Sequence, residues 1–156
     1  MRILGIDPGF GTIGFAILDV HRGERTLIDV GVIRTEPGRE FGDRLIEIHK
    51  DMQELISHYK PDSVAIEKVY FSKNVTTGIQ VSQAKGVILL AIAEAGIIPT
   101  QYSPSEMKAA LTGDGKADKA AIQKMVMLEM GLSSPPKPDD AADALSLALT
   151  LSFELR

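Results

Sequence analysis

Features that would indicate export or a membrane location are scarce in this sequence. It contains no cysteine, so nothing in the composition points to disulfide bonds or secretion. The longest uninterrupted apolar run, residues 87–93, is far shorter than the roughly 18 residues that a membrane-spanning helix needs. Asp7 and Pro8 stand where a signal peptide would require an apolar stretch. The sequence therefore predicts a cytoplasmic protein with no membrane segment.

Positive charge is in slight deficit, since 17 Lys and Arg oppose 21 Asp and Glu for a net charge of −4. A net negative protein is a poor nonspecific binder of polyanions. The charge is unevenly distributed, however, because residues 68–93 contain Lys68, Lys73 and Lys85 and no acidic residue. This lysine segment is either a solvated helix face or a surface that binds phosphates. The length of 156 residues predicts one domain, residues 1–156.

Apolar periodicity and turn residues predict an α/β fold. Closely spaced strands form an antiparallel meander and are followed by alternating helices and strands, which gives a five-stranded mixed sheet with helices on both faces. Strands are predicted at residues 2–6, 12–20, 26–34, 63–66 and 97–102. Helices are predicted from residue 41 to before Pro61, and at about 74–95, 104–111, 119–130 and 139–153.

Gly9-x-Gly11-x-x-Gly14 matches a dinucleotide-binding pattern but occurs in the wrong context. That pattern requires a helix to begin at the glycines, whereas the residues from Thr12 onward are β-branched and typical of a strand. The glycines instead predict a tight hairpin beside Asp7 that leaves room for a bulky group to approach the sheet.

Acidic residues stand where buried elements end. Asp7 follows the apolar residues of the first strand, and Glu67 follows those of the fourth. Asp140 and Asp143, three residues apart, share one face of the last helix; Asp139 with Asp143 fits nearly as well on spacing alone. Taken singly, each of these acids could instead be a helix cap or a turn former with no other role. Taken together, four convergent carboxylates predict a site for hard cations, Mg²⁺ or Mn²⁺.

A site of this kind suits phosphodiester hydrolysis, in which two ions activate water and stabilise the leaving oxygen. Lys108 and Lys119, on either side of a glycine loop, are candidates to neutralise charge on the phosphate. Tyr70 and Phe71 follow Glu67 closely and are either core residues or aromatics that stack on an unpaired base.

Three segments in matching order resemble the RuvC family of crossover junction endodeoxyribonucleases: GIDPGFGTIGFAILD, then AIEKVYFSKN with VSQAKG after it, then PPKPDDAADALSLAL. The resemblance covers essentially the whole chain. It implies a ribonuclease H-like fold and a homodimer in which each subunit holds two divalent ions, Mg²⁺ with Mn²⁺ as a substitute. The implied metal ligands and catalytic acids are Asp7, Glu67, Asp140 and Asp143.

The resemblance also implies roles in binding and cleaving DNA. Lys108 and Lys119 match lysines that are important for cleavage, and Tyr70 takes the place of an aromatic that contacts bases at the junction centre. The remaining candidate substrate-binding residues are Phe71, Lys68, Lys73 and Lys85. Residues 86–92 are apolar all around their predicted helix, which indicates either a dimer interface or burial in the core.

The function that follows is resolution of four-way Holliday junctions by paired symmetric nicks, in recombination and DNA repair. The family resemblance further implies cooperation with the RuvA and RuvB branch-migration complex. Three alternatives are a YqgF-like nuclease acting on RNA, a lobe of an actin-like ATPase, and a noncatalytic junction-binding module. The segment DDAAD and the Tyr70-Phe71 loop favour the resolvase over the first, and the chain is too short to supply the second lobe of the ATPase.

Overall fold

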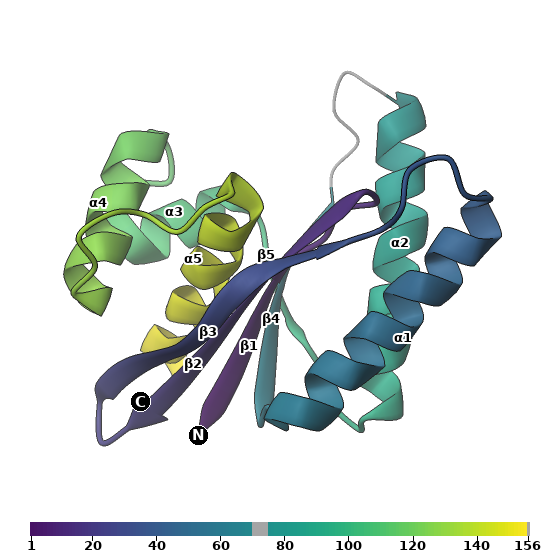
Figure 1. Cartoon of the computed structure of the whole chain (residues 1–156). Helices are drawn as coiled ribbons and strands as arrows, with labels where there is room; N and C mark the ends of the chain where they lie inside the picture. Colours follow the sequence, from purple (N-terminus) through teal and green to yellow (C-terminus); the bar gives the residue numbers. More distant parts are fainter. Residues whose placement is uncertain (70–74, 156) are drawn as a thin grey trace.

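The computed structural model describes residues 1–69 and 75–155. Its centre is a five-stranded sheet with the strand order β3-β2-β1-β4-β5 (Figure 1). The predicted meander is confirmed, because β1 pairs antiparallel with β2 and β2 antiparallel with β3. The strands are β1 (Arg2–Asp7), β2 (Thr12–His21), β3 (Glu24–Arg34), β4 (Ser63–Glu67) and β5 (Thr100–Tyr102).

Strands β1 and β4 are parallel neighbours, with Ile6 beside Ile66 in the register. Each strand has a continuous buried run of apolar residues before its final acid, as expected for strands covered on both faces. Because parallel strands end at the same edge, Asp7 and Glu67 leave the sheet side by side.

The last strand is shorter than predicted. Strand β5 begins at Thr100 and not at residue 97. Pro99 has no backbone N–H to contribute to a ladder, and Ile98 before it is 93% exposed. The apolar letters at 97 and 98 resemble a strand, but they lie outside the sheet.

Two helix layers cover the sheet, as predicted (Figure 1). One face packs against α1 (Phe41–Tyr59) and α2 (Val75–Glu94), which share a core with Leu4, Ile6 and Ile66. The other face is covered chiefly by α5 (Asp139–Glu154), with α3 (Pro104–Thr112) and α4 (Lys119–Met130) outside it.

Side chains cap the N-terminal ends of α3 and α4. The Ser103 side chain accepts a hydrogen bond from the Glu106 backbone while the Glu106 side chain accepts one from the Ser103 backbone, which forms a capping box. Asp118 caps α4 by accepting from the Ala121 backbone. Gly131 ends that helix in the left-handed conformation. These contacts fix the two helices that carry Lys108 and Lys119.

Helix α5 lies unusually close to the sheet. A Cβ atom added at Gly5 would lie 2.1 Å from the carbonyl oxygen of Ala144, and one added at Gly14 would lie 1.9 Å from that of Asp140. Glycines in the neighbouring strands β1 and β2 thus allow the helix backbone to rest directly on the strands. This contact sets the height of the N-terminal turn of α5 above the end of β1.

Helix α2 is long and apolar enough to cross a membrane by length and composition alone. A core helix of a soluble protein meets the same criterion. Uninterrupted apolar runs do not reveal this property, because polar residues divide the helix into shorter runs. Ile88 and Ile92 are buried against α1 and the sheet, while Ile79 and Leu90 are 45% and 52% exposed. Burial in the core therefore accounts for one side of the helix only.

Candidate active site

The four predicted acids come from three elements that meet at one edge of the sheet. Asp7 ends β1 and Glu67 ends β4, while Asp140 and Asp143 lie in the first two turns of α5. The register pairs Asp7 with Gly14, and Gly14 is the residue on which the Asp140 backbone rests. The close packing of helix on strand therefore brings the carboxylates of α5 to the end of β1.

The electrostatics confirm that these acids are neighbours. Burial raises the pKa of Asp7 to about 8, and the charges of Glu67 and Asp143 add to the increase. Asp140 contributes through its charge and through a side-chain hydrogen bond with Asp7. Burial likewise raises the pKa of Glu67, as does the nearby Asp143 carboxylate. Acids this close destabilise one another when all are ionised, which is typical of a functional site rather than of a structural cluster.

Asp143 is the most exposed of the four acids. Desolvation by the surrounding protein raises its pKa, while Lys119 lowers it and the acids at 139 and 140 raise it. It therefore lies at the boundary between the buried acids and the solvent-exposed lysine.

The donor set fits hard divalent cations in its chemistry. It contains carboxylate oxygens and neither His nor Cys, which is the preference of Mg²⁺ and Mn²⁺. Cations bound there would also relieve the repulsion that raises the pKa of Asp7. The side chains do not form a closed cage: across residues 1–69 and 75–155, no three His, Cys, Asp or Glu side chains are grouped to hold a metal ion. The assignment of ligands remains a prediction.

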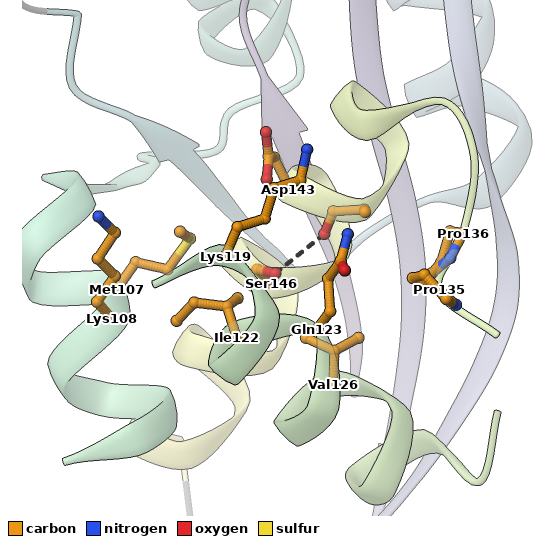
Figure 2. Close-up of a pocket in the computed structure, with 11 residues that line it drawn as sticks. Met107, Lys108, Lys119, Ile122, Gln123, Val126, Pro135, Pro136, Asp143 and Ser146 are labelled. Atoms are coloured by element: carbon orange, nitrogen blue, oxygen red, sulfur yellow. Dashed lines mark hydrogen bonds between the residues drawn. The ribbon is translucent and has the colours of Figure 1, made fainter. Parts of the chain in front are cut away.

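Lys119 lies beside Asp143, and Lys108 lies on another side of the same cavity (Figure 2). The two lysines line this cavity together with Asp143, Lys108 from α3 and Lys119 from the start of α4. Lys119 also pairs with Asp139, and both of these side chains are exposed. Asp139 is thereby engaged with Lys119, so Asp140 is the acid next to Asp7, as the family resemblance implies.

The lysine segment is not one continuous DNA-binding surface. Lys68 pairs with Glu106 of α3 at 3.0 Å. Lys85 is only 9% exposed and donates to the side-chain oxygen of Gln101 at 2.8 Å, with Glu67 as a nearby opposite charge. The Lys85 ammonium is directed into the fold and not at the surface, so the structure does not support its predicted place on the substrate surface, and that role remains a prediction. Tyr70, Phe71 and Lys73 lie outside the residues that the structure describes, and their predicted roles remain predictions.

The burial of Lys85 has a measurable consequence. We expect Lys85→Met, which keeps the side chain's length and removes its charge, to leave the slope of log affinity against log salt concentration unchanged for four-way junctions. Removal of a lysine that contacts phosphate reduces this slope by about one. Titrations of a fluorescent junction at several salt concentrations measure it, with thermal melting to verify folding. A slope lower by about one would return Lys85 to the DNA surface.

Two contributors to the site were not foreseen in their actual roles. The glycine motif predicts that Gly14 belongs to a hairpin open to a bulky group. In the structure, the group that approaches Gly14 is the backbone of α5. Gly5, within an otherwise apolar strand, has the same role further along the helix. Glycine inside a buried strand was the available signal, since it often marks close approach of another backbone.

The profile of the family Crossover junction endodeoxyribonuclease RuvC matches residues 3–151. The chain belongs to the RuvC family. The match includes all four candidate acids and both candidate lysines. The match favours the RuvC family over two of the alternatives, a YqgF-like nuclease and a lobe of an actin-like ATPase. Members of this family are endodeoxyribonucleases that depend on divalent metal ions.

Individual relatives agree over nearly their whole length. A Synechococcus sp. (strain WH7803) crossover junction endodeoxyribonuclease RuvC is 44% identical over 154 residues, covering 99% of each chain. The same-named protein of Chloroflexus aurantiacus (strain ATCC 29366) is 46% identical over 153 residues, with 98% of this chain and 93% of the relative covered.

A solved structure, T. thermophilus RuvC in complex with Holliday junction substrate, superposes with a TM-score of 0.92. It is 34% identical, and the match covers 100% of this chain and 95% of that one. The predicted ribonuclease H-like α/β fold is confirmed.

Proposed function

We propose that the chain resolves Holliday junctions, cutting DNA strands at a centre formed by Asp7, Glu67, Asp140 and Asp143. The observation that carries the assignment is the junction of three elements: two parallel strands end in acids beneath a helix that begins with two more. The family match supports endonucleolytic cleavage of crossover junctions as the reaction.

The four carboxylates would hold two Mg²⁺ ions, with Mn²⁺ as a substitute. Bound there, the ions would supply an activated water and stabilise the leaving oxygen. Asp7 and Glu67 are fixed by strand hydrogen bonds, so they would be rigid ligands. Asp140 and Asp143 project from α5, whose position is fixed by its contact with Gly5 and Gly14. The proposed ligands thus lie on regular elements and not on loops.

The two lysines would bind and orient the phosphate. Lys119 is exposed and lies close enough to Asp143 to lower the pKa of that carboxyl. Lys108 reaches the same cavity from α3. Their positive charges would offset negative charge on the phosphate that the acids alone would repel.

Paired nicks would require two copies of this site. We propose a homodimer in which α2 contributes to the interface, because Ile79 and Leu90 leave apolar surface exposed on that helix. A twofold dimer would match the symmetry of a four-way junction. Cooperation with RuvA and RuvB, and a cytoplasmic location, are further proposals that rest on the family resemblance and the sequence.

Metal removal tests the proposed chemistry. In EDTA, the protein should bind a synthetic four-way junction and leave every strand intact, because the lysines remain but the acids hold no cation. Adding Mg²⁺ or Mn²⁺ should restore symmetric nicks with 5′-phosphate ends, which ligase can seal. Denaturing electrophoresis of four separately labelled strands measures the cuts. Cleavage that persists in EDTA would contradict a metal-dependent site.

A further inference from the structure

A buried lysine behind the acids carries a charge that the proposed function does not use. Lys85 is only 9% exposed and lies beside the buried Ala84, one turn of α2 from the buried Ile88. Lysine is rarely buried, because removing an ammonium from water costs free energy unless hydrogen bonds or opposite charges offset it. The surroundings of Lys85 therefore have to supply that compensation.

The hydrogen-bond partner of this ammonium is neutral. Lys85 Nζ donates to the side-chain oxygen of Gln101 at 2.8 Å. Within residues 1–69 and 75–155, no carboxylate forms an ion pair with Lys85. Lys119, by contrast, pairs directly with Asp139 at the surface, where water and salt screen both charges. The charge of Lys85 is therefore compensated from further away.

The register places the ammonium at the acidic end of the sheet. Gln101 of β5 lies beside Ile66 in the parallel ladder, one residue before Glu67. Burial lowers the pKa of Lys85, and the charge of Glu67 opposes that decrease. Burial and the charge of Asp143 raise the pKa of Glu67, and the charge of Lys85 opposes that increase. The opposite charge that Lys85 interacts with thus belongs to the acidic centre.

Lys85 approaches this centre from the opposite face of the sheet to the acids of α5. Helix α2 packs in the layer that shares a core with Ile66, whereas Asp143 projects from α5 on the other face (Figure 1). An ammonium offers no lone pair to a metal ion. Lys85 therefore acts on the centre through its charge alone, and the protein interior screens that charge less than water does.

Charge balance gives the sign of the effect. Two divalent cations would balance the four carboxylates, so Lys85 would leave the loaded centre with one positive charge in excess. A phosphodiester carries one negative charge, and bound DNA would restore the balance. Without DNA, the like charge of Lys85 would oppose the binding of cations.

We propose that Lys85 is an internal counter-charge that lowers the affinity of the four acids for divalent cations and so sets the metal concentration that cleavage requires. The inference rests on the proposed function, because it concerns the same acids. In this role Lys85 contacts neither the DNA nor the metal ions, which agrees with its burial.

A titration with Mn²⁺ in the absence of DNA tests the effect of the charge. Free Mn²⁺ gives a paramagnetic resonance signal that is lost on binding, so bound ions are counted without any cleavage. Lys85→Met should bind Mn²⁺ about fivefold or more tightly than the parent, the scale of one charge acting on a divalent ion through the protein interior. Lys85→Arg keeps the charge and should bind as the parent does. Equal affinities for Lys85→Met and the parent would overturn the proposal.

The variant Gln101→Ala separates the charge from the hydrogen bond. It removes the partner of the ammonium and leaves the charge in place, and Gln101 is exposed, so its truncation leaves no buried cavity. This variant should bind Mn²⁺ as the parent does. A gain in affinity equal to that of Lys85→Met would assign the effect to the link between α2 and β5, which contradicts a role for the charge.

Arg25→Met is the matched control for the loss of a cation. Arg25 lies near the start of β3, at the other end of the sheet, where its Nε donates to the Ser152 hydroxyl at 2.7 Å. Its side chain is 14% exposed. This variant should keep the parent's affinity for Mn²⁺, and thermal melting verifies that each variant is folded. Tighter binding by Arg25→Met, to the same extent as by Lys85→Met, would attribute the effect to net charge and not to Lys85.

The metal requirement of cleavage provides the second measurement. In single-turnover cutting of a four-way junction, Lys85→Met should reach its half-maximal rate at a several-fold lower Mg²⁺ concentration than the parent. An unchanged midpoint would refute the proposed control of the metal requirement. If the parent cuts no junction, the proposed function fails, while the Mn²⁺ titration still decides the effect of Lys85 on the acids.

Discussion

Asp7→Asn abolishes cleavage of four-way junctions while junction binding persists. Asn keeps the shape of the side chain but removes the central negative charge, since Asp7 is the acid that interacts with Glu67, Asp140 and Asp143 together. We expect a loss of about a thousandfold or more in cleavage rate, the scale for loss of an essential catalytic group. Gel-shift titration measures binding and single-turnover cleavage in Mg²⁺ measures the rate.

Asp62→Asn is the matched control. Asp62 lies at the opposite end of the same sheet, where its carboxylate accepts a hydrogen bond from the Arg2 backbone at 2.6 Å. It has the same chemistry and no contact with the candidate site, so this variant should cut at the parent's rate. Equal cutting by Asp7→Asn and the parent would remove Asp7, and the site built around it, from the reaction.

The same substitution should stabilise the metal-free protein. The pKa of Asp7 is raised to about 8 in the folded chain and is about 3.9 in an unfolded one. Between these values the folded state holds a proton that the unfolded state has lost, so stability falls as pH rises from about 4 to 8. Asn does not ionise and avoids this loss, so function at this position opposes stability.

Thermal melting in EDTA measures the effect. At pH 8, Asp7→Asn should raise the free energy of unfolding by about 1–3 kcal/mol, a Tm increase of several degrees for a chain of this size. The difference should shrink as the pH falls toward 4, because the folded parent keeps its proton and the carboxyl of the unfolded chain also becomes protonated as the pH passes below about 3.9. A variant less stable than the parent at pH 8 would show that Asp7 carries no unfavourable charge.

Gly14→Ala should cost both stability and cleavage. Its Cβ would lie 1.9 Å from the Asp140 carbonyl oxygen and 2.4 Å from the carbonyl carbon. Both are backbone atoms, so relief requires α5 to move away from β2. We expect destabilisation by about 3 kcal/mol or more, and loss of cleavage in the folded fraction because Asp140 and Asp143 move with the helix.

The comparison glycine is Gly42, in the first turn of α1. An added Cβ there meets nothing within 4 Å, so Gly42→Ala should stabilise the chain by about 0.5–1 kcal/mol. Urea unfolding gives both values, and cleavage below the midpoint of unfolding tests the displaced acids. A Gly14→Ala variant with the parent's stability would refute the direct contact between α5 and the sheet.

Much of the candidate site was accessible from the sequence because its signals are local. Apolar residues that end in a single acid identified Asp7 and Glu67, and right-handed crossover connections made their strands parallel neighbours. The spacing of three in the last helix identified Asp140 and Asp143 as residues on one face. Spacing left Asp139 open, and the structure places that residue against Lys119.

Expectation and structure differ where the outcome depends on contacts between distant segments. Lys85 was assigned to DNA because its neighbours in sequence lack acids, but α2 turns it toward Gln101 and Glu67. The start of β5 was misjudged because Ile98 is apolar and yet exposed.

The sequence by itself determined the order of the elements and the set of candidate acids, with Asp139 left open beside Asp140, because hydrophobic periodicity and strand ends each depend on a few neighbouring residues. Only the tertiary structure decided that α5 rests on Gly5 and Gly14, that Lys85 is buried, and that a cavity opens beside Asp143. The physical reason is that close approach, burial of a long side chain and empty volume are properties of packed surfaces. Those surfaces are formed by residues that lie far apart in the chain.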